Sequence, residues 1–301
     1  MSSVLVVGQI ARDLVLEVDS IPSPGGSARV RARVEVLGGK GANQAVGLRQ
    51  LAGPEGPRVS LLGVAGTDAT GDAVLRQARA DGVHVDGVVR RGTTALLVDV
   101  VEPGGSRRLI EHVPAEAELT PQDVHRADRA GLLRADWVCV QLQQPDPAVL
   151  EAVRAARRAG ARVLVDGAAT SATRDELLRE VDVLRADADE AQSWVDGDAM
   201  SPSATLDCAH QLVESGPEVV ALAVRDRGDA VAWRGGERYL PHRDDAVVDP
   251  TGAGDAFVAG LLTGLIRGGP RDAAALAGAC AAATVKHAGG RPRLRARRPA
   301  Q

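Results

Sequence analysis

The chain has 301 residues, of which 45% are hydrophobic and 25% charged, enough for one large α/β domain or two ordinary ones. Its 36 basic and 40 acidic residues give a net charge of −4, which argues against nucleic acid or an anionic membrane as a partner. No apolar run reaches the roughly 18 residues of a membrane span, and the first residues lack the basic region of a signal peptide. Cys139, Cys208 and Cys280 are widely spaced, so we expect no disulfide framework, no zinc site and a cytoplasmic location.

The N-terminal part combines buried strands with strands that expose one face. Residues 4–7 are a short apolar run, as in a buried strand, whereas residues 14–18 alternate apolar and polar side chains. Pro103-Gly104-Gly105 is typical of a hairpin turn. In chain order we predict strands at 4–7, 14–18, 29–36, 59–64, 83–89, 94–101 and 107–112, and helices at 42–51 and 71–81.

Beyond residue 137 strands and helices alternate, which predicts a mostly parallel sheet covered on both faces. The half-polar strands at 14–36 and 94–112 do not fit that pattern, and we assign them to a separate small sheet with one exposed face. The later strands are predicted at 137–142, 162–165, 181–184, 218–224, 230–233 and 237–240. The later helices are predicted at 147–159, 189–194 and 203–215, with two more beginning near Gly254 and Arg271.

The strongest functional signal is the segment DPTGAGDAF at 249–257, where glycines precede a predicted helix. Glycines let the backbone approach a ligand closely, and the N–H groups and dipole at a helix start favour an anion. Asp255 lies in the first turn of this helix, where a carboxylate also has purely structural value. In phosphoryl transfer the same element would supply donors for the phosphate and a base for the acceptor hydroxyl. The dipole should keep Asp255 ionised at neutral pH.

A second glycine cluster, GGKGANQ, occupies 38–44. It is not a P-loop, because Gly41 replaces the Ser or Thr that follows the lysine, and neither cluster fits a GxGxxG dinucleotide fingerprint. The segment is a tight turn into a helix, or a site where Lys40 and Asn43 hydrogen-bond a polyhydroxylated ligand.

Three features occur in a fixed order along the chain: Gly8 with Asp13, then GGKGANQA at 38–45, then DPTGAGDAF at 249–257. Over nearly its whole length the chain resembles the ribokinase-like carbohydrate kinases of the phosphofructokinase B type. The resemblance implies an ATP-dependent sugar kinase with a single domain over 1–301 and a three-layer α/β/α core. It also implies a small β lid, formed by about 12–37 and 93–113, that closes over the sugar and in many members is a homodimer interface.

The resemblance also implies a role for each matching residue. Asp255 would be the catalytic base, with Gly252, Ala253 and Gly254 as the anion hole. The sugar would contact Asp13, Gly39, Lys40, Asn43 and Gln143. ATP would contact Asp187, Glu190, Arg225 and Gly228, with Glu190 placing Mg²⁺ directly or through water. Asp249 and Thr251 match a site where many relatives bind a monovalent cation such as K⁺.

Several positions depart from ribokinase itself. Ala11 replaces a sugar-binding Asn and Gln143 replaces a Glu, which leaves the sugar open because a site with missing partners rejects substrates strongly. Asp187 replaces an Asn, and Arg225 is either a phosphate contact or a surface residue. Arg293 replaces a Ser near the cation site, so K⁺ activation is open too. Two alternatives remain: a nucleoside kinase, disfavoured by only five aromatic residues, and a binding protein with weakened catalysis.

Overall fold

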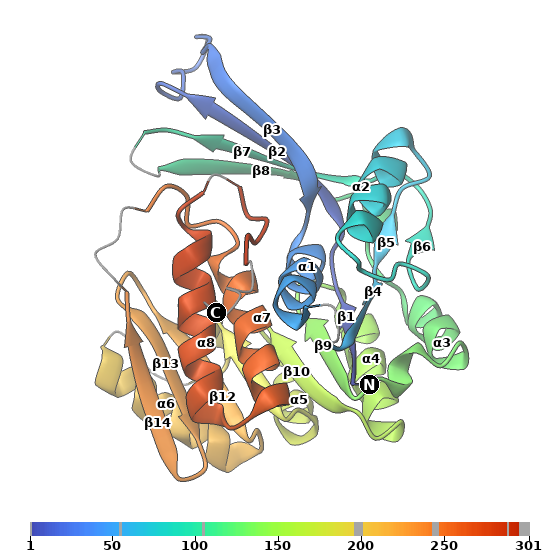
Figure 1. Ribbon diagram of the computed structural model, residues 1–301, viewed down its shortest axis with the longest axis vertical. Helices are drawn as coiled ribbons and strands as arrows, with labels where there is room; N and C mark the ends of the chain where they lie inside the picture. Colours follow the sequence, from blue (N-terminus) through green and yellow to red (C-terminus); the bar gives the residue numbers. More distant parts are fainter. Residues whose placement is uncertain are drawn as a thin grey trace, which may run out of the picture.

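The protein is known from a computed structural model that describes residues 2–53, 56–103, 106–195, 201–242, 247–287 and 289–294. A central sheet has the strand order β14-β13-β12-β11-β10-β9-β1-β4 (Figure 1). From β4 to β12 neighbouring strands are parallel, and β13 and β14 continue the sheet antiparallel. The strands are β1 (Ser3–Val7), β4 (Arg58–Leu62), β9 (Trp137–Gln141), β10 (Arg162–Asp166), β11 (Val183–Ala186), β12 (Val219–Val224), β13 (Gly228–Trp233) and β14 (Gly236–Pro241).

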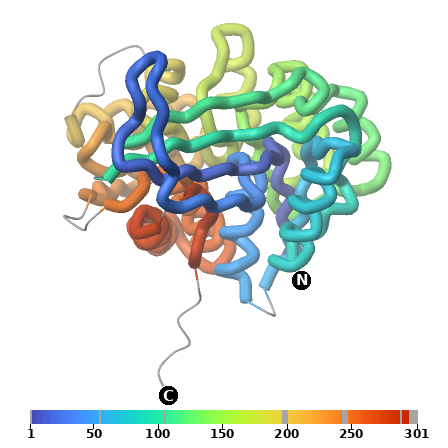
Figure 2. Tube along the Cα trace, turned by 90° about the horizontal axis from the view of Figure 1, so that it is seen from above, coloured from blue at the N-terminus to red at the C-terminus, as the bar shows by residue number. Residues whose placement is uncertain are grey.

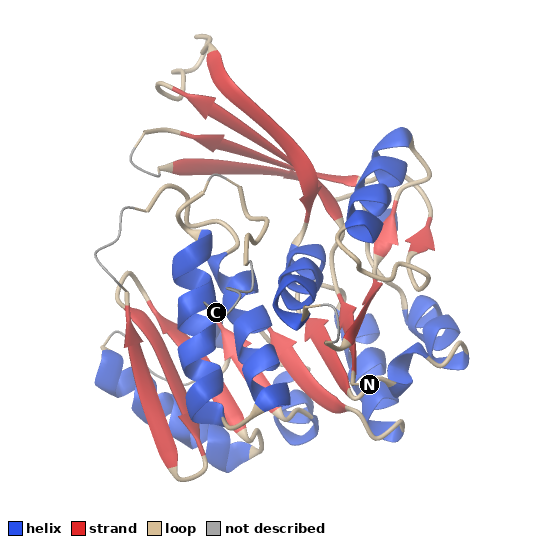
Figure 3. Cartoon of the chain, in the orientation of Figure 1, coloured by secondary structure: helices blue, strands red, loops and turns tan. Residues whose placement is uncertain are grey.

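Helices cover both faces of this sheet (Figure 3). In β1 the side chains of Val4 and Val6 join one hydrophobic cluster, whereas Leu5 and Val7 join another, because successive strand residues point to opposite faces. The first cluster includes α1 (Lys40–Ala52), α2 (Ala69–Ala80), α7 (Ala253–Arg267) and α8 (Pro270–Thr284). The second includes α3 (Pro121–Arg129), α4 (Asp146–Arg158), α5 (Arg174–Glu180) and α6 (Pro202–Ser215). The predicted three-layer α/β/α architecture is confirmed.

A second sheet of four strands lies over one end of the core, and Figure 2 looks onto it from above. Its order is β3-β2-β7-β8, with β7 and β8 paired antiparallel as predicted; Gly104 and Gly105 of the predicted turn lie outside the described residues. In β2 the side chains of Ala11, Asp13 and Val15 are buried, whereas the residues between them are partly exposed. We call this sheet the lid; its strands are β2 (Ala11–Val18), β3 (Val30–Gly38), β7 (Ala95–Val101) and β8 (Arg107–His112), and a further two-stranded sheet contains β5 (Val64–Ala65) and β6 (Val89–Arg90).

Four elements differ from the sequence predictions. The strand predicted at 83–89 is not formed: within it only His84 bridges to Ser60, and Val89 begins β6. The helix predicted at 189–194 is a single 3₁₀ turn, η3 (Glu190–Ser193), and α3 and α5 were not predicted. Helix α3 begins with a capping box in which Thr120 and Asp123 exchange side-chain and backbone hydrogen bonds, a signal readable from Thr-Pro-x-Asp. Within the described ranges, every helix is too short or too polar to cross a bilayer.

Candidate active site

The carboxyl ends of three adjacent parallel strands carry a polar cluster. Asp166 ends β10 in register with Gln141 of β9 and with Arg185 of β11. Arg185 Nη1 donates to Asp166 Oδ1 over 2.9 Å, and Gln141 Nε2 donates to Asp166 Oδ2 over 3.2 Å. Ligands of open α/β sheets bind at this edge. None of these residues was predicted as functional, although each is a polar residue at or near the end of an apolar strand, a signal readable from sequence.

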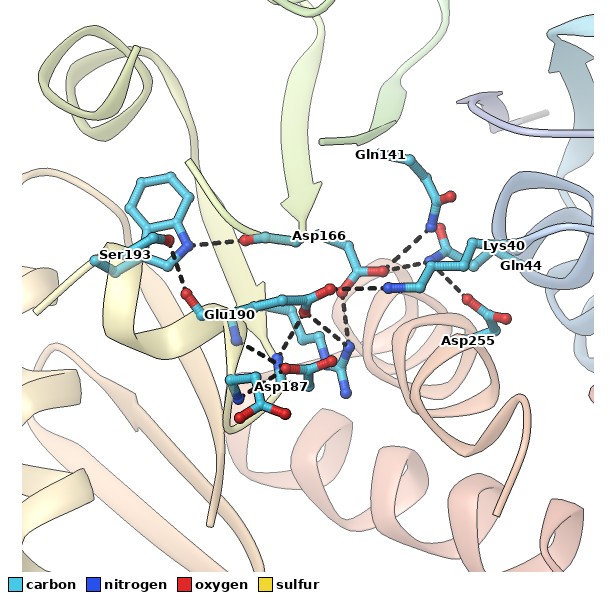
Figure 4. Close-up of polar contacts among 12 residues, drawn as sticks. Lys40, Gln44, Gln141, Asp166, Asp187, Glu190, Ser193 and Asp255 are labelled. Carbon is cyan, nitrogen blue, oxygen red and sulfur yellow. Dashed lines mark hydrogen bonds and ion pairs between the residues drawn. The ribbon is translucent and has the colours of Figure 1, made fainter. Parts of the chain in front are cut away.

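Asp255, in the first turn of α7, joins this cluster through helix α1 (Figure 4). Its Oδ2 accepts a hydrogen bond from Asn43 Nδ2 at 3.2 Å and its Oδ1 one from Gln44 Nε2 at 3.3 Å. Gln44 Nε2 also donates to Asp166 Oδ2 over 2.7 Å. Among the described residues Asp255 has no salt-bridge partner, so its carboxylate is held by amides and remains free to exchange a proton.

Burial sets the proton affinity of this carboxylate. Removal from water, together with the nearby charge of Asp166, raises the pKa of Asp255 from 3.8 to about 7, against the opposing effects of Lys40, Asn43 and Arg185. The expectation that the helix dipole keeps Asp255 ionised at neutral pH is therefore wrong: desolvation outweighs the dipole, and the group titrates near pH 7. A pKa close to the working pH is the value at which a general base is most effective.

The start of α7 is shaped to accept an anion. Gly252 has φ 75°, and a Cβ there would lie 1.9 Å from the Gly290 carbonyl oxygen, so the position requires glycine. No side chain caps the helix, and within the described residues the N–H groups of Gly254 and Asp255 have no acceptor. Ala253, which was predicted to contribute to the anion hole, instead donates its N–H to the Pro250 carbonyl over 3.3 Å. A Cβ on Gly254 would lie 2.7 Å from Arg185 Nη2, so a guanidinium borders the same backbone. Uncapped amides and a buried cation together fit a phosphate.

Asp13 and Asn43 present unused acceptors on the lid side. Asp13 Oδ1 and Asn43 Oδ1 are buried, and neither has a hydrogen-bond partner in the described part of the chain. A Cβ on Gly38 would lie 1.8 Å from Asp13 Cγ, so this glycine makes room for the carboxylate. Gly39 has φ 86° and passes close to the Gln9 carbonyl. Buried acceptors without donors are costly, and hydroxyl groups of a bound sugar would satisfy them.

The pKa of Asp13 is also raised to about 7. Burial is the main cause, followed by the charges of Asp99 and Asp255, while the Gly39 amide and Arg107 oppose the shift. Two carboxylates on facing elements therefore titrate in the same range and influence each other.

Lys40, predicted to contact the sugar, is bonded to Glu190, predicted to contact ATP. Its Nζ donates to Glu190 Oε1 over 2.8 Å, and Glu190 Oε2 lies 3.8 Å from Arg185 Nη1. Burial lowers the pKa of Lys40, but Asp166, Glu190 and Asp255 raise it more, so the net shift is upward and the lysine is charged. Lys40 and Glu190, which were predicted to bind different substrates, therefore belong to one ion-pair network (Figure 4).

The other residues predicted to contact ATP are Asp187, Arg225 and Gly228. Asp187 Oδ1 accepts from the N–H groups of Asp189 and Glu190, and Glu190 Oε2 accepts from the Asp187 N–H, so both carboxylates cap η3. Arg225 is half exposed and paired with Asp189. Gly228 begins β13, where a Cβ would lie 2.1 Å from the Leu240 carbonyl oxygen, which alone requires glycine. Gln143 follows β9 and is exposed.

The side chains of Asp249 and Thr251 are already engaged in hydrogen bonds. Asp249 Oδ1 accepts from the Thr251 N–H and hydroxyl at 2.8 and 2.5 Å, and its Oδ2 accepts from the Gly289 N–H at 2.8 Å. The Thr251 hydroxyl accepts in turn from Arg107 Nη1 of the lid at 2.7 Å. A guanidinium already stands beside the loop, and a second cation there would be repelled, so these residues do not fit a bound K⁺.

The described residues do not form a magnesium site made of protein side chains alone. The described residues contain no group of three or more His, Cys, Asp or Glu side chains placed to hold a metal. Magnesium at a nucleotide site, however, is held by one or two carboxylates with phosphates and water. Glu190, whose side chain is 13% exposed, is the carboxylate that fits this limited role.

Comparisons with known proteins agree with this geometry. The model of the pfkB family of carbohydrate kinases matches residues 1–297. A bifunctional ribokinase/ribose-5-phosphate isomerase A from Fructilactobacillus sanfranciscensis is 28% identical over 88% of this chain, which spans 49% of that longer protein. An ATP-dependent ribose-1-phosphate kinase from Halopiger xanaduensis is 30% identical, covering 97% of this chain and 94% of the relative.

The fold is shared with solved structures. Ribokinase from Arabidopsis thaliana, complexed with ribose and ATP, superposes with a TM-score of 0.78 over 96% of this chain and 94% of that one, at 24% identity. The family match spans almost the entire sequence and includes both glycine motifs that meet at Asp255. The chain therefore belongs to the pfkB family of carbohydrate kinases, which are phosphotransferases with an alcohol acceptor.

Proposed function

We propose that the protein transfers the γ-phosphoryl group of ATP to a hydroxyl of a sugar, with Asp255 as the base. The observation that carries this proposal is the position of Asp255: buried, outside any salt bridge of the described residues, and bonded to Asn43 and Gln44 beside an uncapped helix start. A carboxylate with a pKa near 7 next to free amides is suited to both parts of the reaction.

In the proposed reaction the acceptor oxygen attacks the γ-phosphorus as its proton passes to Asp255. The bond from the γ-phosphorus to the β,γ-bridging oxygen breaks, and its electron pair leaves with ADP. The amides of Gly254 and Asp255 bind the transferring oxygens, and Arg185 adds positive charge beside them. Asn43 and Gln44 orient the base. Since phosphoryl transfer depends mainly on positioning and charge stabilisation, this set is sufficient.

ATP and magnesium belong to the nucleotide side of the proposal. Glu190 would hold Mg²⁺, directly or through water, and Mg²⁺ when bound neutralises charge on the phosphates. Lys40 pairs with Glu190, so its ammonium group is already placed at the boundary between sugar and nucleotide. Asp187 acts by capping η3 and fixing Glu190, and Arg225 by pairing with Asp189 at the rim. The K⁺ requirement is not part of the proposal, because Asp249 and Thr251 do not fit that ion.

A neutral sugar is the first acceptor class, because Asp13 and Asn43 offer acceptors to hydroxyl donors. A phosphorylated sugar is the second. The observation that favours it is the lid guanidinium of Arg107, which is one-third exposed beside Asp13, together with Gln143 in place of a charged Glu. One of the relatives named above acts on ribose 1-phosphate by its name.

ADP release with a panel of pentoses, hexoses, pentose phosphates and nucleosides tests both classes. We expect turnover with a neutral or phosphorylated sugar and a loss of at least about 100-fold in Asp255→Asn. Turnover of nucleosides alone would favour the nucleoside kinase alternative. Binding without turnover of any acceptor, or full activity in Asp255→Asn, would overturn the proposal.

We also propose a cytoplasmic homodimer that forms through the outer face of the lid. By strand register Leu14, Leu96 and Ile110 lie on the same face of the lid, and Ile110 is 61% exposed. A hollow of about 470 Å³ opens on this side, lined in part by Arg12 and His112. Apolar faces of this kind mark interaction sites. Light scattering should give twice the chain mass, and Ile110→Glu should give monomers; a monomeric wild type would contradict the proposal.

A further inference from the structure

Arg107 connects the lid to the loop that begins α7. It lies in β8, and its Nη1 donates to Asp99 Oδ1 of β7 over 2.8 Å and to Thr251 Oγ1 over 2.7 Å. The Thr251 hydroxyl donates onward to Asp249 Oδ1, and Asp249 Oδ2 accepts from the Gly289 N–H. One continuous chain of hydrogen bonds therefore runs from the lid, through the anion-hole loop, to the segment at 289.

The charges around Arg107 explain why a cation belongs there. Asp99 is 3% exposed, and its pKa is raised mainly by burial, against the opposing effect of Arg107. Asp249 is fully buried and close enough to raise the pKa of Asp99 further. Arg107 is the cation that most lowers the pKa of both Asp99 and Asp13, so it offsets the repulsion among these carboxylates.

The loop that Arg107 contacts determines the anion hole. Thr251 directly precedes Gly252, whose left-handed backbone turns the chain into α7 and exposes the N–H groups of Gly254 and Asp255. Arg107 is itself one-third exposed, so it lies at the mouth of the site and not in the core. Its contact with Thr251 spans 144 residues of sequence and exists only while the lid lies against the core.

We propose that Arg107 is a positioning residue that couples closure of the lid to the order of the anion hole, and that its guanidinium replaces a monovalent cation at the Asp249–Thr251 loop. This inference rests on the proposed kinase function. With the lid closed, Arg107 fixes Thr251 and hence the amides that receive the phosphoryl group. With the lid open the tether is lost, so the site is complete only when an acceptor is enclosed, which suppresses transfer to water.

Arg107→Met tests the coupling, with Arg108→Met as the matched control. Both remove one positive charge from β8, but Arg108 is exposed, and in the described part of the chain it bonds only to Ser106 and the Arg107 carbonyl. We expect kcat of Arg107→Met to fall about 10- to 100-fold, because misplaced groups lower rates on that scale. We also expect little change in the KM for ATP, and a larger ratio of ATP hydrolysis to sugar phosphorylation. Arg108→Met should behave as wild type.

The dependence of the rate on added cations is a second test, because replacing a merely structural residue would not change it. Wild-type rates should be equal in potassium chloride and tetramethylammonium chloride of the same ionic strength. Arg107→Met should gain activation by K⁺ or by added guanidinium. A wild type that K⁺ activates several-fold, or a variant with wild-type kcat in both salts, would overturn the inference.

Hydrogen exchange separates failure of this inference from failure of the proposed function. Amides of 251–256 should exchange faster in Arg107→Met than in wild type or Arg108→Met, whether or not any acceptor is turned over. Unchanged exchange in that segment would refute the coupling. Faster exchange in a protein without kinase activity would support the coupling and refute only the proposed function.

Discussion

Asp255→Asn should make the protein more stable at pH 8 while removing its activity. The pKa of Asp255 is raised from 3.8 to about 7, so ionising the folded protein at this site is unfavourable. A shift of about 3 units at about 1.36 kcal/mol per unit gives a cost of up to about 4 kcal/mol in the free energy of unfolding. The sign follows from linkage: stability from a raised carboxyl pKa is complete below about pH 4 and is lost as pH rises through about 7.

The surroundings of Asp255 accept an amide in place of its carboxylate. The oxygen of the substituted side chain would still accept from Gln44 Nε2, as Asp255 Oδ1 does. The new amide nitrogen would face Asn43, whose Oδ1 has no partner among the described residues and becomes an acceptor when the Asn43 amide turns over. The substitution therefore removes a buried charge, and the turned Asn43 amide places its nitrogen where its unpartnered oxygen stood.

Urea denaturation at several pH values measures the effect. The difference in unfolding free energy between Asp255→Asn and wild type should grow by about 2 to 3 kcal/mol from pH 5 to pH 8. Asp249→Asn is the control: its carboxylate accepts three hydrogen bonds from Thr251 and Gly289, so an amide there should destabilise the protein by about 1–3 kcal/mol. An Asp255→Asn protein no more stable than wild type at pH 8, or a difference independent of pH, would refute the reasoning.

Three further outcomes follow from the same geometry. The value of kcat/KM should rise with pH through an apparent pKa of about 7, because the base acts when deprotonated and both Asp13 and Asp255 titrate there; a flat profile between about pH 6 and 8 would contradict this. Gly38→Ala should raise the sugar KM far more than the KM for ATP, since its Cβ would displace the Asp13 carboxylate; equal effects on both would argue against this contact. Arg185→Met should lower the free energy of unfolding, measured by urea denaturation, by about 3–5 kcal/mol, because the buried Asp166 loses its salt-bridge partner; a change under about 1 kcal/mol would show that this pair is unimportant.

Much of the fold and part of the site were predictable from local patterns. Strand alternation separated the lid from the core, because strands buried on two faces and strands buried on one differ in composition. The glycine clusters predicted tight turns into helices, and Gly39 and Gly252 have positive φ angles at those turns; a close approach to a ligand stays a prediction. The assigned roles of Asp187, Arg225 and Gly228 stay predictions; in the structure the first caps a turn, the second pairs at the surface and the third makes room for Leu240.

By itself the sequence determined the layers, the lid strands and the two motifs that contain Lys40 and Asp255, because hydrophobic period and glycine placement are local properties. Only the tertiary structure decided what surrounds that aspartate. Burial raised its pKa against the helix dipole, and register in the parallel sheet placed Arg185 beside Asp166. The approach of the lid brought Arg107 to Thr251 across 144 residues. Desolvation and long-range charge depend on which segments meet in space, and no local pattern records that.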